Sequence, residues 1–215
     1  GKDDDLFDRP TVVAVAPTGE FYVADGYGNS RVLKYSKEGK LLKQWGRKRT
    51  DEREFNLPHA ICLDAKGRVY VGDRQNNRVQ VFRQNGEFVR EKILRPRCGA
   101  QEQATWTPKR PCGTEAAFSI GFSHDAPQTY VYVADGGSHF ITVLRRSDLE
   151  VVSEFGGPGV GPGQLGRPHN LSVDPSGNIF VAEAAGPSVK NAAGESVEAG
   201  FRAQKFTFKG TQPAR

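Results

Sequence analysis

The chain has 215 residues, of which 37% are hydrophobic and 26% are charged, and its formal net charge is +5. This composition is typical of a globular protein, and no apolar run approaches the roughly 20 residues that a membrane-spanning helix needs. The basic residues are scattered, without a basic face that carries interleaved aromatic residues, so we expect no nucleic-acid partner.

The first part of the chain predicts short strands separated by turns. Runs rich in β-branched and aromatic residues predict strands at 12–16, 21–24, 31–36 and 41–45. The segments Pro17-Thr18-Gly19 and Lys37-Glu38-Gly39 have the composition of tight turns. The next part repeats this pattern, with strands expected at 60–63, 69–72, 78–82 and 88–91. No window keeps the period of about 3.6 residues that a helix requires.

One sequence frame recurs along the chain. Its copies align at residues 9–25, 57–73, 118–135 and 167–183, the third with a longer turn. Each copy ends its second predicted strand on an acidic residue, namely Asp25, Asp73, Asp135 or Glu183. Because these carboxylates recur once per copy, we expect them to cap turns or to pair with Arg31 and Arg78, and not to form a hydrolytic pair.

Four short antiparallel strands in a repeat of about 40 to 50 residues are typical of a β-propeller blade. An antiparallel sandwich of the same strands is the alternative, but the regular acidic position favours radial repetition. We therefore predict one all-β propeller domain over residues 1–215. Its blades are expected near 8–46, 56–94, 115–156 and 167–209, with an insertion loop at 95–114.

Two cysteines, Cys98 and Cys112, flank the irregular insertion. We expect a disulfide between them, because the CxxC spacing of a zinc-binding pair is absent. A disulfide persists in an oxidising compartment, so this pair predicts a secreted or periplasmic protein.

Two histidines occupy the same place in the frame. The position that precedes each first strand holds Thr11, His59, Phe118 and His169. Equal frame positions lie at equal height and radius in a propeller, so His59 and His169 are expected near the axis, two blades apart. Zinc in catalytic sites favours three protein ligands and one open position. The pair therefore predicts two thirds of a zinc site, with hydrogen-bonded structural histidines as the alternative.

The other two histidines, His124 and His139, lie in turn-like contexts and are expected at the surface.

The recurring pattern Pro-x-x-apolar-x-apolar-Asp-x-x-Gly, followed by aromatic-Val-x-Asp and Asn-x-Arg, resembles the NHL repeat. More narrowly, the segments VADGYGNSR at 23–31, QWG at 44–46, FNLPH at 55–59 and GDRQNNR at 72–78 resemble the lyase domain of the peptidylglycine α-amidating enzymes. The tightest resemblance covers residues 8–91. Beyond them, only the RPH segment at 167–169 matches the lyase motif.

That family is a six-bladed propeller with zinc at its axis, and it splits a peptidyl-α-hydroxyglycine into a peptide amide and glyoxylate. The resemblance implies that the four blades here belong to a six-bladed ring. Because the first copy resembles the family's third blade, two upstream blades, and with them the third zinc ligand, are expected to precede residue 1.

The resemblance also implies roles for individual residues. Tyr27 corresponds to the reactive tyrosine, which acts as the base on the substrate hydroxyl. Arg74, in the equivalent turn of the next blade, is expected to stabilise the ionised tyrosine and to bind a carboxylate or carbonyl of the substrate. His59 and His169 correspond to zinc ligands. Asn170 stands where the lyases carry an aspartate that helps to bind a structural calcium.

Some positions depart from the family. Arg167 stands where the lyases carry an apolar methionine, Asn170 lacks the aspartate's charge, and the catalytic arginine of the first blade has no counterpart. The chain by itself is therefore expected to have little or no activity. We predict a lyase-like zinc protein acting on a peptide or small-molecule substrate. A non-catalytic NHL propeller that binds a peptide, protein or glycan is the alternative, and the oligomeric state is not predicted.

Overall fold

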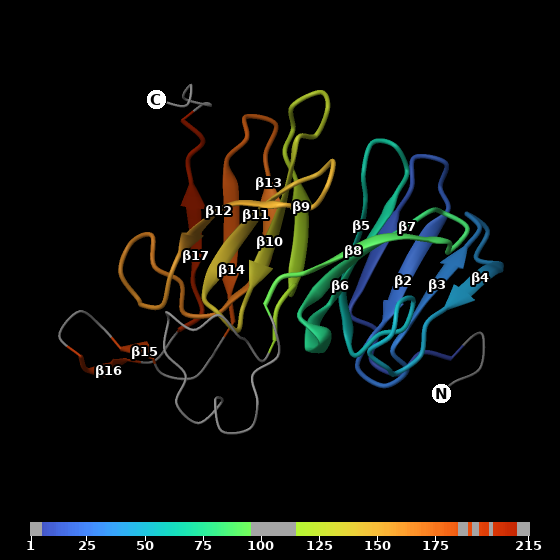
Figure 1. Ribbon diagram of the computed structural model, residues 1–215, viewed down its shortest axis with the longest axis horizontal. Coiled ribbons are helices and arrows are strands. Elements are labelled where there is room, and N and C mark those ends of the chain that lie inside the picture. The colour runs from blue at the N-terminus through green and yellow to red at the C-terminus, as the bar shows by residue number, and fades with distance from the viewer. Residues whose placement is uncertain (1–5, 96–114, 185–188, 191–193, 198–199, 210–215) are drawn as a thin grey trace.

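The computed structural model describes residues 6–95, 115–184, 189–190, 194–197 and 200–209. Its strands form four antiparallel blades, which confirms the predicted all-β propeller (Figure 1). Blade 1 consists of β1 (Val12–Val15), β2 (Phe21–Asp25), β3 (Arg31–Tyr35) and β4 (Leu41–Trp45). Blade 2 consists of β5 (Pro58–Leu63), β6 (Val69–Asp73), β7 (Arg78–Phe82) and β8 (Phe88–Ile93), with the 3-10 turn η1 (Arg74–Asn76) between β6 and β7.

Blade 3 consists of β9 (Ser119–Phe122), β10 (Tyr130–Asp135), β11 (Phe140–Arg145) and β12 (Val151–Gly156). Blade 4 consists of β13 (Pro168–Val173), β14 (Ile179–Glu183) and β17 (Ala203–Phe206), and within the described part of the chain it has no fourth strand. A separate hairpin pairs β15 (Val189–Lys190) with β16 (Ser196–Val197). The membership of these blades in a six-bladed ring stays a prediction.

The blades lie side by side in chain order (Figure 1). Their first strands β1, β5, β9 and β13 contact one another in that order, so the start of each blade faces a common centre. The second strands of blades 1 to 3 are buried on both faces because neighbouring blades stack on them; from Tyr22 to Asp25, for example, every residue of β2 is buried. In blade 4, Phe180 and Ala182 of β14 are exposed. Between blades 1 and 2, Trp45 packs against Tyr22 and Phe82, with ring centroids 6.4 and 5.7 Å away.

In blades 1 and 2 the recurring acidic residue pairs with the first residue of the third strand. Arg31 Nε donates to Asp25 Oδ2 at 3.1 Å, and Arg78 Nε donates to Asp73 Oδ2 at 2.8 Å, so both predicted pairs are confirmed. The other carboxylate oxygen accepts a backbone N–H, that of Asp8 in blade 1 and of Asn56 in blade 2. These carboxylates are structural, as the repeat frame indicates.

The prediction that His139 lies at the surface is wrong. Its side chain is buried, and its Nδ1 donates to the carbonyl of Gly166, in the connection that leads to blade 4. It lies in the turn between β10 and β11, where its φ of 68° is in the left-handed region. His124 is exposed, as expected.

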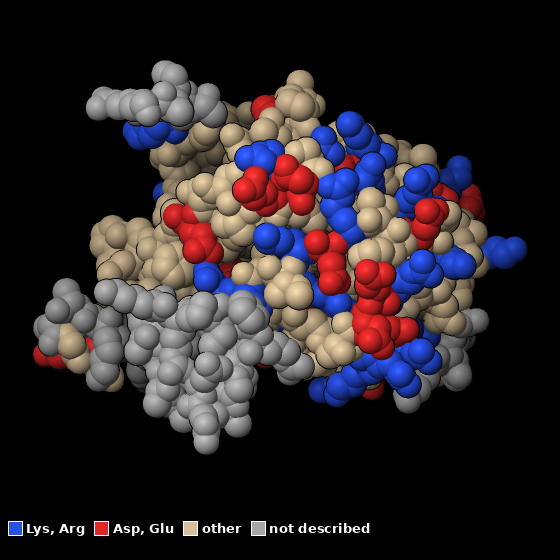
Figure 2. Space-filling model, viewed as in Figure 1, with Lys and Arg blue, Asp and Glu red and all other residues tan. Residues whose placement is uncertain are grey.

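Several expectations fall outside the described residues, which end at Arg95 and resume at Glu115. The Cys98–Cys112 disulfide is one of them, and the secreted or periplasmic location that depends on it stays a prediction. Within the described ranges no helix is long and apolar enough to cross a bilayer. On the face drawn in Figure 2, Lys and Arg side chains are interspersed with Asp and Glu.

Candidate metal and substrate site

The two histidines of the repeat frame share one local backbone. In blade 2, Pro58 pairs with Asp73 and Ala60 pairs with Gly72, so His59 has no cross-strand partner. In blade 4, Pro168 pairs with Glu183 and Asn170 pairs with Ala182, which leaves His169 unpaired in the same way. Such β-bulges change the direction of a side chain. They supply the local reason why both imidazoles leave the plane of their sheets.

A glycine of the preceding blade packs against each bulge. A Cβ on Gly26 would lie 2.2 Å from the carbonyl oxygen of Pro58, and one on Gly136 would lie 2.9 Å from that of Pro168. The Thr11 hydroxyl also donates to the Pro58 carbonyl, at 2.9 Å. Only a residue without a side chain allows this approach, so these glycines set the position of the two histidine-bearing segments.

The bulges bring the two imidazoles together at the centre. The ring centroids of His59 and His169 are 4.9 Å apart, and the rings cross at 82°. The Phe118 ring lies 5.4 Å from each of them. A cavity of about 220 Å³ is lined by the same frame position of all four blades, namely Thr11, His59, Phe118 and His169, together with neighbouring strand residues.

The protonation of His59 follows from its partners. Nδ1 lies 2.8 Å from the carbonyl oxygen of Phe118 and must donate to it, which leaves Nε2 as the nitrogen with a lone pair. Burial lowers the pKa of His59 to about 4, and the nearby charge of Arg74 acts in the same direction. The pKa of His169 is also lowered, first by burial and then by the guanidinium groups of Arg74 and Arg167. Both rings are therefore neutral near pH 7, the form that binds metals.

Tyr27 and Arg74 meet His59 on the rim of the propeller. The Tyr27 hydroxyl lies 3.4 Å from His59 Nε2, and Arg74 Nη1 donates to the Tyr27 oxygen at 3.2 Å. Tyr27 is 45% exposed, whereas Arg74 is 7% exposed. Both line a cavity of about 370 Å³, which Lys48 and Glu115 line as well. The structure thus joins Tyr27, Arg74 and His59 in one chain of polar contacts, with His169 beside it.

Three residues of this cluster were missed as site residues by sequence reasoning. Glu115 Oε2 accepts hydrogen bonds from Arg74 Nη2 at 2.7 Å and from Arg167 Nη2 at 3.0 Å. The Phe118 ring lies beneath both guanidinium groups, 4.1 Å from Arg74 Cζ and 5.4 Å from Arg167 Cζ. The available signals were that Phe118 occupies the frame position that holds histidine in blades 2 and 4, and that Arg167 lies two residues before His169.

The residues fit zinc in part. His59 presents Nε2 while a carbonyl fixes its other nitrogen, the usual arrangement of a zinc-bound histidine. The described residues contain no group of three His, Cys, Asp or Glu side chains placed to hold a metal. They therefore supply two imidazoles, and beside them the Tyr27 oxygen, for an ion that favours three protein ligands.

Asn170 does not fit a calcium site as it lies here. Its Oδ1 accepts hydrogen bonds from the Ser119 hydroxyl and from the Leu171 N–H, both at 2.9 Å. The two lone pairs of that oxygen are thus engaged.

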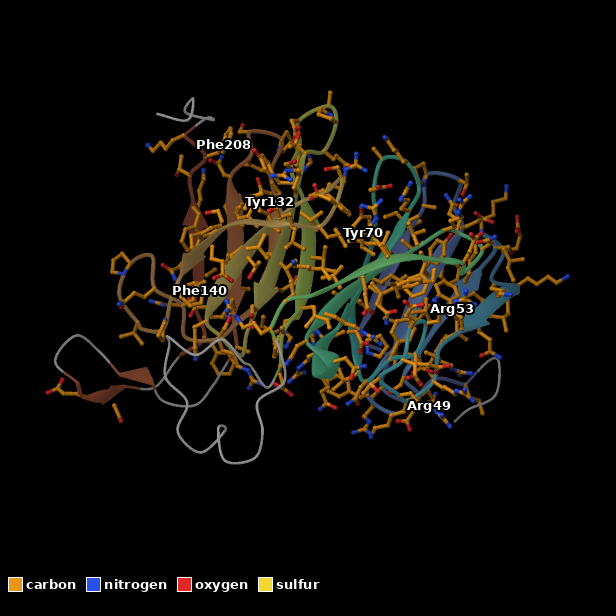
Figure 3. All side chains as sticks on the ribbon, viewed as in Figure 1. Arg49, Arg53, Tyr70, Tyr132, Phe140 and Phe208 are labelled. Atoms are coloured by element: carbon orange, nitrogen blue, oxygen red, sulfur yellow. The ribbon has the colours of Figure 1, made fainter. Side chains whose placement is uncertain are left out.

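A larger cavity of about 540 Å³ lies between blades 3 and 4, where Tyr132 and Phe208 are among the residues that line it (Figure 3). It shares no lining residue with the cavities at His59 and Tyr27. No residue of the candidate site reaches it, so volume alone does not identify the site.

This geometry defines a β-propeller with paired histidines at its centre and a tyrosine–arginine pair on the adjoining rim. The NHL repeat model matches residues 7–35 and 55–82, in blades 1 and 2. The chain is an NHL-repeat β-propeller.

Its relatives include proteins named for NHL repeats and proteins named as amidating enzymes. Human NHL repeat-containing protein 3 is 30% identical over 195 residues, which cover 82% of this chain and 47% of that protein. Peptidyl-alpha-hydroxyglycine alpha-amidating lyase 1 of Drosophila melanogaster is 32% identical over 194 residues, which cover 82% of this chain and 33% of that protein. The chain thus spans less than half the length of these homologues.

Solved structures support the fold alone. Virginiamycin B lyase from Staphylococcus aureus is similar with a TM-score of 0.59 at 14% identity, over 94% of this chain and 56% of that one.

Proposed function

We propose that this chain carries part of the active site of a peptidyl-α-hydroxyglycine amidating lyase, which converts the substrate into a peptide amide and glyoxylate. The observation that carries the proposal is the position of the Tyr27 oxygen between Arg74 Nη1 and His59 Nε2. Homology to proteins named as amidating lyases gives independent support.

The residues have separate roles in this reaction. Tyr27, as the phenolate, accepts the proton of the substrate hydroxyl, and the Arg74 guanidinium stabilises the negative charge on its oxygen. The O–H electron pair becomes the second bond of the glyoxylate carbonyl as the carbon–nitrogen bond breaks. The departing amide nitrogen takes up a proton, which Tyr27 can return to it, so the reaction consumes no other reagent.

His59 and His169 would hold the metal. Zinc bound there would polarise a substrate oxygen. The neutral state of both rings and the Phe118 carbonyl on Nδ1 of His59 prepare them for this role. Because zinc favours a third protein ligand, we propose that the third comes from residues outside the described part of the chain.

A binding propeller without catalysis is the second candidate. It is favoured by Arg167, which pairs with Glu115 beside the histidines where the lyases carry an apolar residue. In that case the rim cavity at Tyr27 and Arg74 would hold a peptide, protein or glycan without converting it.

Release of glyoxylate from a peptide ending in α-hydroxyglycine distinguishes the two candidates. The zinc-loaded chain, at its full natural length, is expected to release glyoxylate and peptide amide in equal amounts, faster than the spontaneous reaction. Binding of the peptide without release above that background would contradict the lyase and support the binding propeller.

A further inference from the structure

Two arginines from different blades are held side by side at the rim. Arg74 follows β6 of blade 2, and Arg167 precedes β13 of blade 4. Both donate to the same oxygen of Glu115, at 2.7 and 3.0 Å. The bulges and the contacts between the first strands bring these distant residues to one place.

The Phe118 ring fixes both side chains from below. Arg74 Cζ lies 4.1 Å and Arg167 Cζ 5.4 Å from its centroid, within the range of cation–π interactions. The Arg74 side chain is 9% exposed and that of Arg167 is 28% exposed. Two guanidinium groups are therefore held beside one aromatic ring and one carboxylate before any ligand arrives.

The charges of this cluster do not balance. Glu115 neutralises one of the two guanidinium groups, and the ammonium-bearing Lys48 lines the same cavity as Arg74 and Glu115. Within the described residues, Arg74 Nε is buried without a hydrogen-bond partner. Partly buried positive charge with donors in a planar fork matches the geometry of a carboxylate.

We propose that Arg74 and Arg167 form a clamp for the carboxylate of a ligand, and that Glu115 occupies this clamp until the ligand displaces it. The inference rests on the proposed function, whose substrate carries a carboxylate at its C-terminal end. It adds Arg167 as a residue that determines specificity and Glu115 as a carboxylate that competes with the ligand.

The clamp makes a prediction that a purely structural ion pair does not. If Glu115 only holds the two blades together, Glu115→Gln weakens the site. If Glu115 competes with the ligand, the same variant strengthens the binding of a carboxylate. The neutral side-chain amide that replaces the Glu115 carboxylate forms weaker hydrogen bonds with the guanidinium groups, so the ligand displaces it more easily.

The test compares two peptides that differ only at the end, one with a C-terminal glycine carboxylate and one with a glycine amide. Calorimetry on the chain at its full natural length measures both affinities. We expect a preference for the carboxylate of at least about ten-fold, since a charge-assisted hydrogen bond contributes that much. Arg167→Gln should lower the affinity for the carboxylate about ten-fold and leave that for the amide unchanged, whereas Glu115→Gln should raise the affinity for the carboxylate several-fold.

Two further variants complete the experiment. Arg167→Lys keeps the charge without the planar fork and should lie between wild type and Arg167→Gln, which gives a readout if the glutamine variant folds poorly. Arg145→Gln is the control, because Arg145 is an exposed arginine that also pairs with carboxylates but lies on blade 3 away from the site.

Equal affinity for both peptides in the wild type would overturn the clamp. So would a loss in Arg167→Gln that affects both peptides equally. Because binding needs no turnover, a chain that selects the carboxylate but releases no glyoxylate would contradict the lyase and leave the clamp standing. A chain that releases glyoxylate but does not prefer the carboxylate peptide would support the lyase and contradict the clamp.

Discussion

The carbonyl oxygen of Phe118 in blade 3 accepts the Nδ1 proton of His59 in blade 2 at 2.8 Å. This single bond crosses the boundary between two blades and sets the tautomer of the imidazole. Nε2 is left facing the Tyr27 hydroxyl at the edge of the central cavity. The packing of neighbouring blades therefore fixes the nitrogen that we propose as a zinc ligand, as the hydrogen-bond partners of ligating histidines do in zinc sites.

The approach of Pro58 to Gly26 should be essential for this geometry. Gly26→Ala places a methyl group 2.2 Å from the Pro58 carbonyl oxygen, so the bulge that carries His59 must move. We expect lower stability and at least about ten-fold weaker zinc binding, the size of effect that disturbed ligand support produces. Gly200→Ala is the control, because its methyl group meets no neighbouring atom and its backbone lies outside the left-handed region. Equal zinc affinity in both variants would contradict this role of Gly26.

Tyr27→Phe tests the proposed base. Removing the hydroxyl should reduce the rate of glyoxylate release by about a hundred-fold or more, the contribution typical of general acid–base catalysis. The melting temperature should change little, because Tyr27 is 45% exposed and only its hydroxyl is removed. Tyr130→Phe, which alters a tyrosine of the separate cavity between blades 3 and 4, should keep the wild-type rate. A Tyr27→Phe variant with full activity would exclude the phenol as the base.

Burial of His139 predicts a pH-dependent stability. Burial lowers its pKa below the ordinary value of 6.5, so the unfolded chain binds a proton more readily than the folded one. The free energy of unfolding should therefore fall as the pH drops below about 6.5. Urea unfolding of His139→Gln between pH 7.5 and 4.5 should show a smaller fall than wild type. His124→Gln, which alters an exposed histidine, should follow the wild type, and identical profiles for all three proteins would contradict the prediction.

The buried ion pair of blade 2 should contribute strongly to stability. Asp73→Asn leaves the Arg78 guanidinium, whose side chain is 5% exposed, without its main counter-ion. Breaking such a pair from one side costs about 3 to 5 kcal/mol, which urea unfolding measures. Asp148→Asn, in an exposed pair with Arg145, should change the stability little. A small effect of Asp73→Asn would mean that Glu91 alone neutralises Arg78.

The fold could be predicted because the repeat frame encodes it locally. The predicted strand at 78–82 coincides with β7, and the one at 21–24 differs from β2 by a single residue. Turn residues and β-branched runs determine such strands without reference to the rest of the chain. The frame also indicated that His59 and His169 would share the centre, and their rings are 4.9 Å apart.

What the sequence did not reveal depends on contacts between blades. Glu115 belongs to the site only because the backbone carries Arg74 and Arg167 to the same carboxylate oxygen. His139 looked like a turn residue, and its buried hydrogen bond to Gly166 depends on the next connection. Neither contact leaves a periodic signal, so spacing along the chain cannot predict it.

Zinc stoichiometry tests the paired histidines most directly. The chain at its full natural length, loaded with zinc and dialysed, is expected to retain one zinc ion per chain by elemental analysis. His59→Gln and His169→Gln should each lose it, while His124→Gln, which alters an exposed histidine, should keep it. Absence of zinc from the wild-type protein, or retention of zinc by both variants, would contradict a metal centre between the two imidazoles.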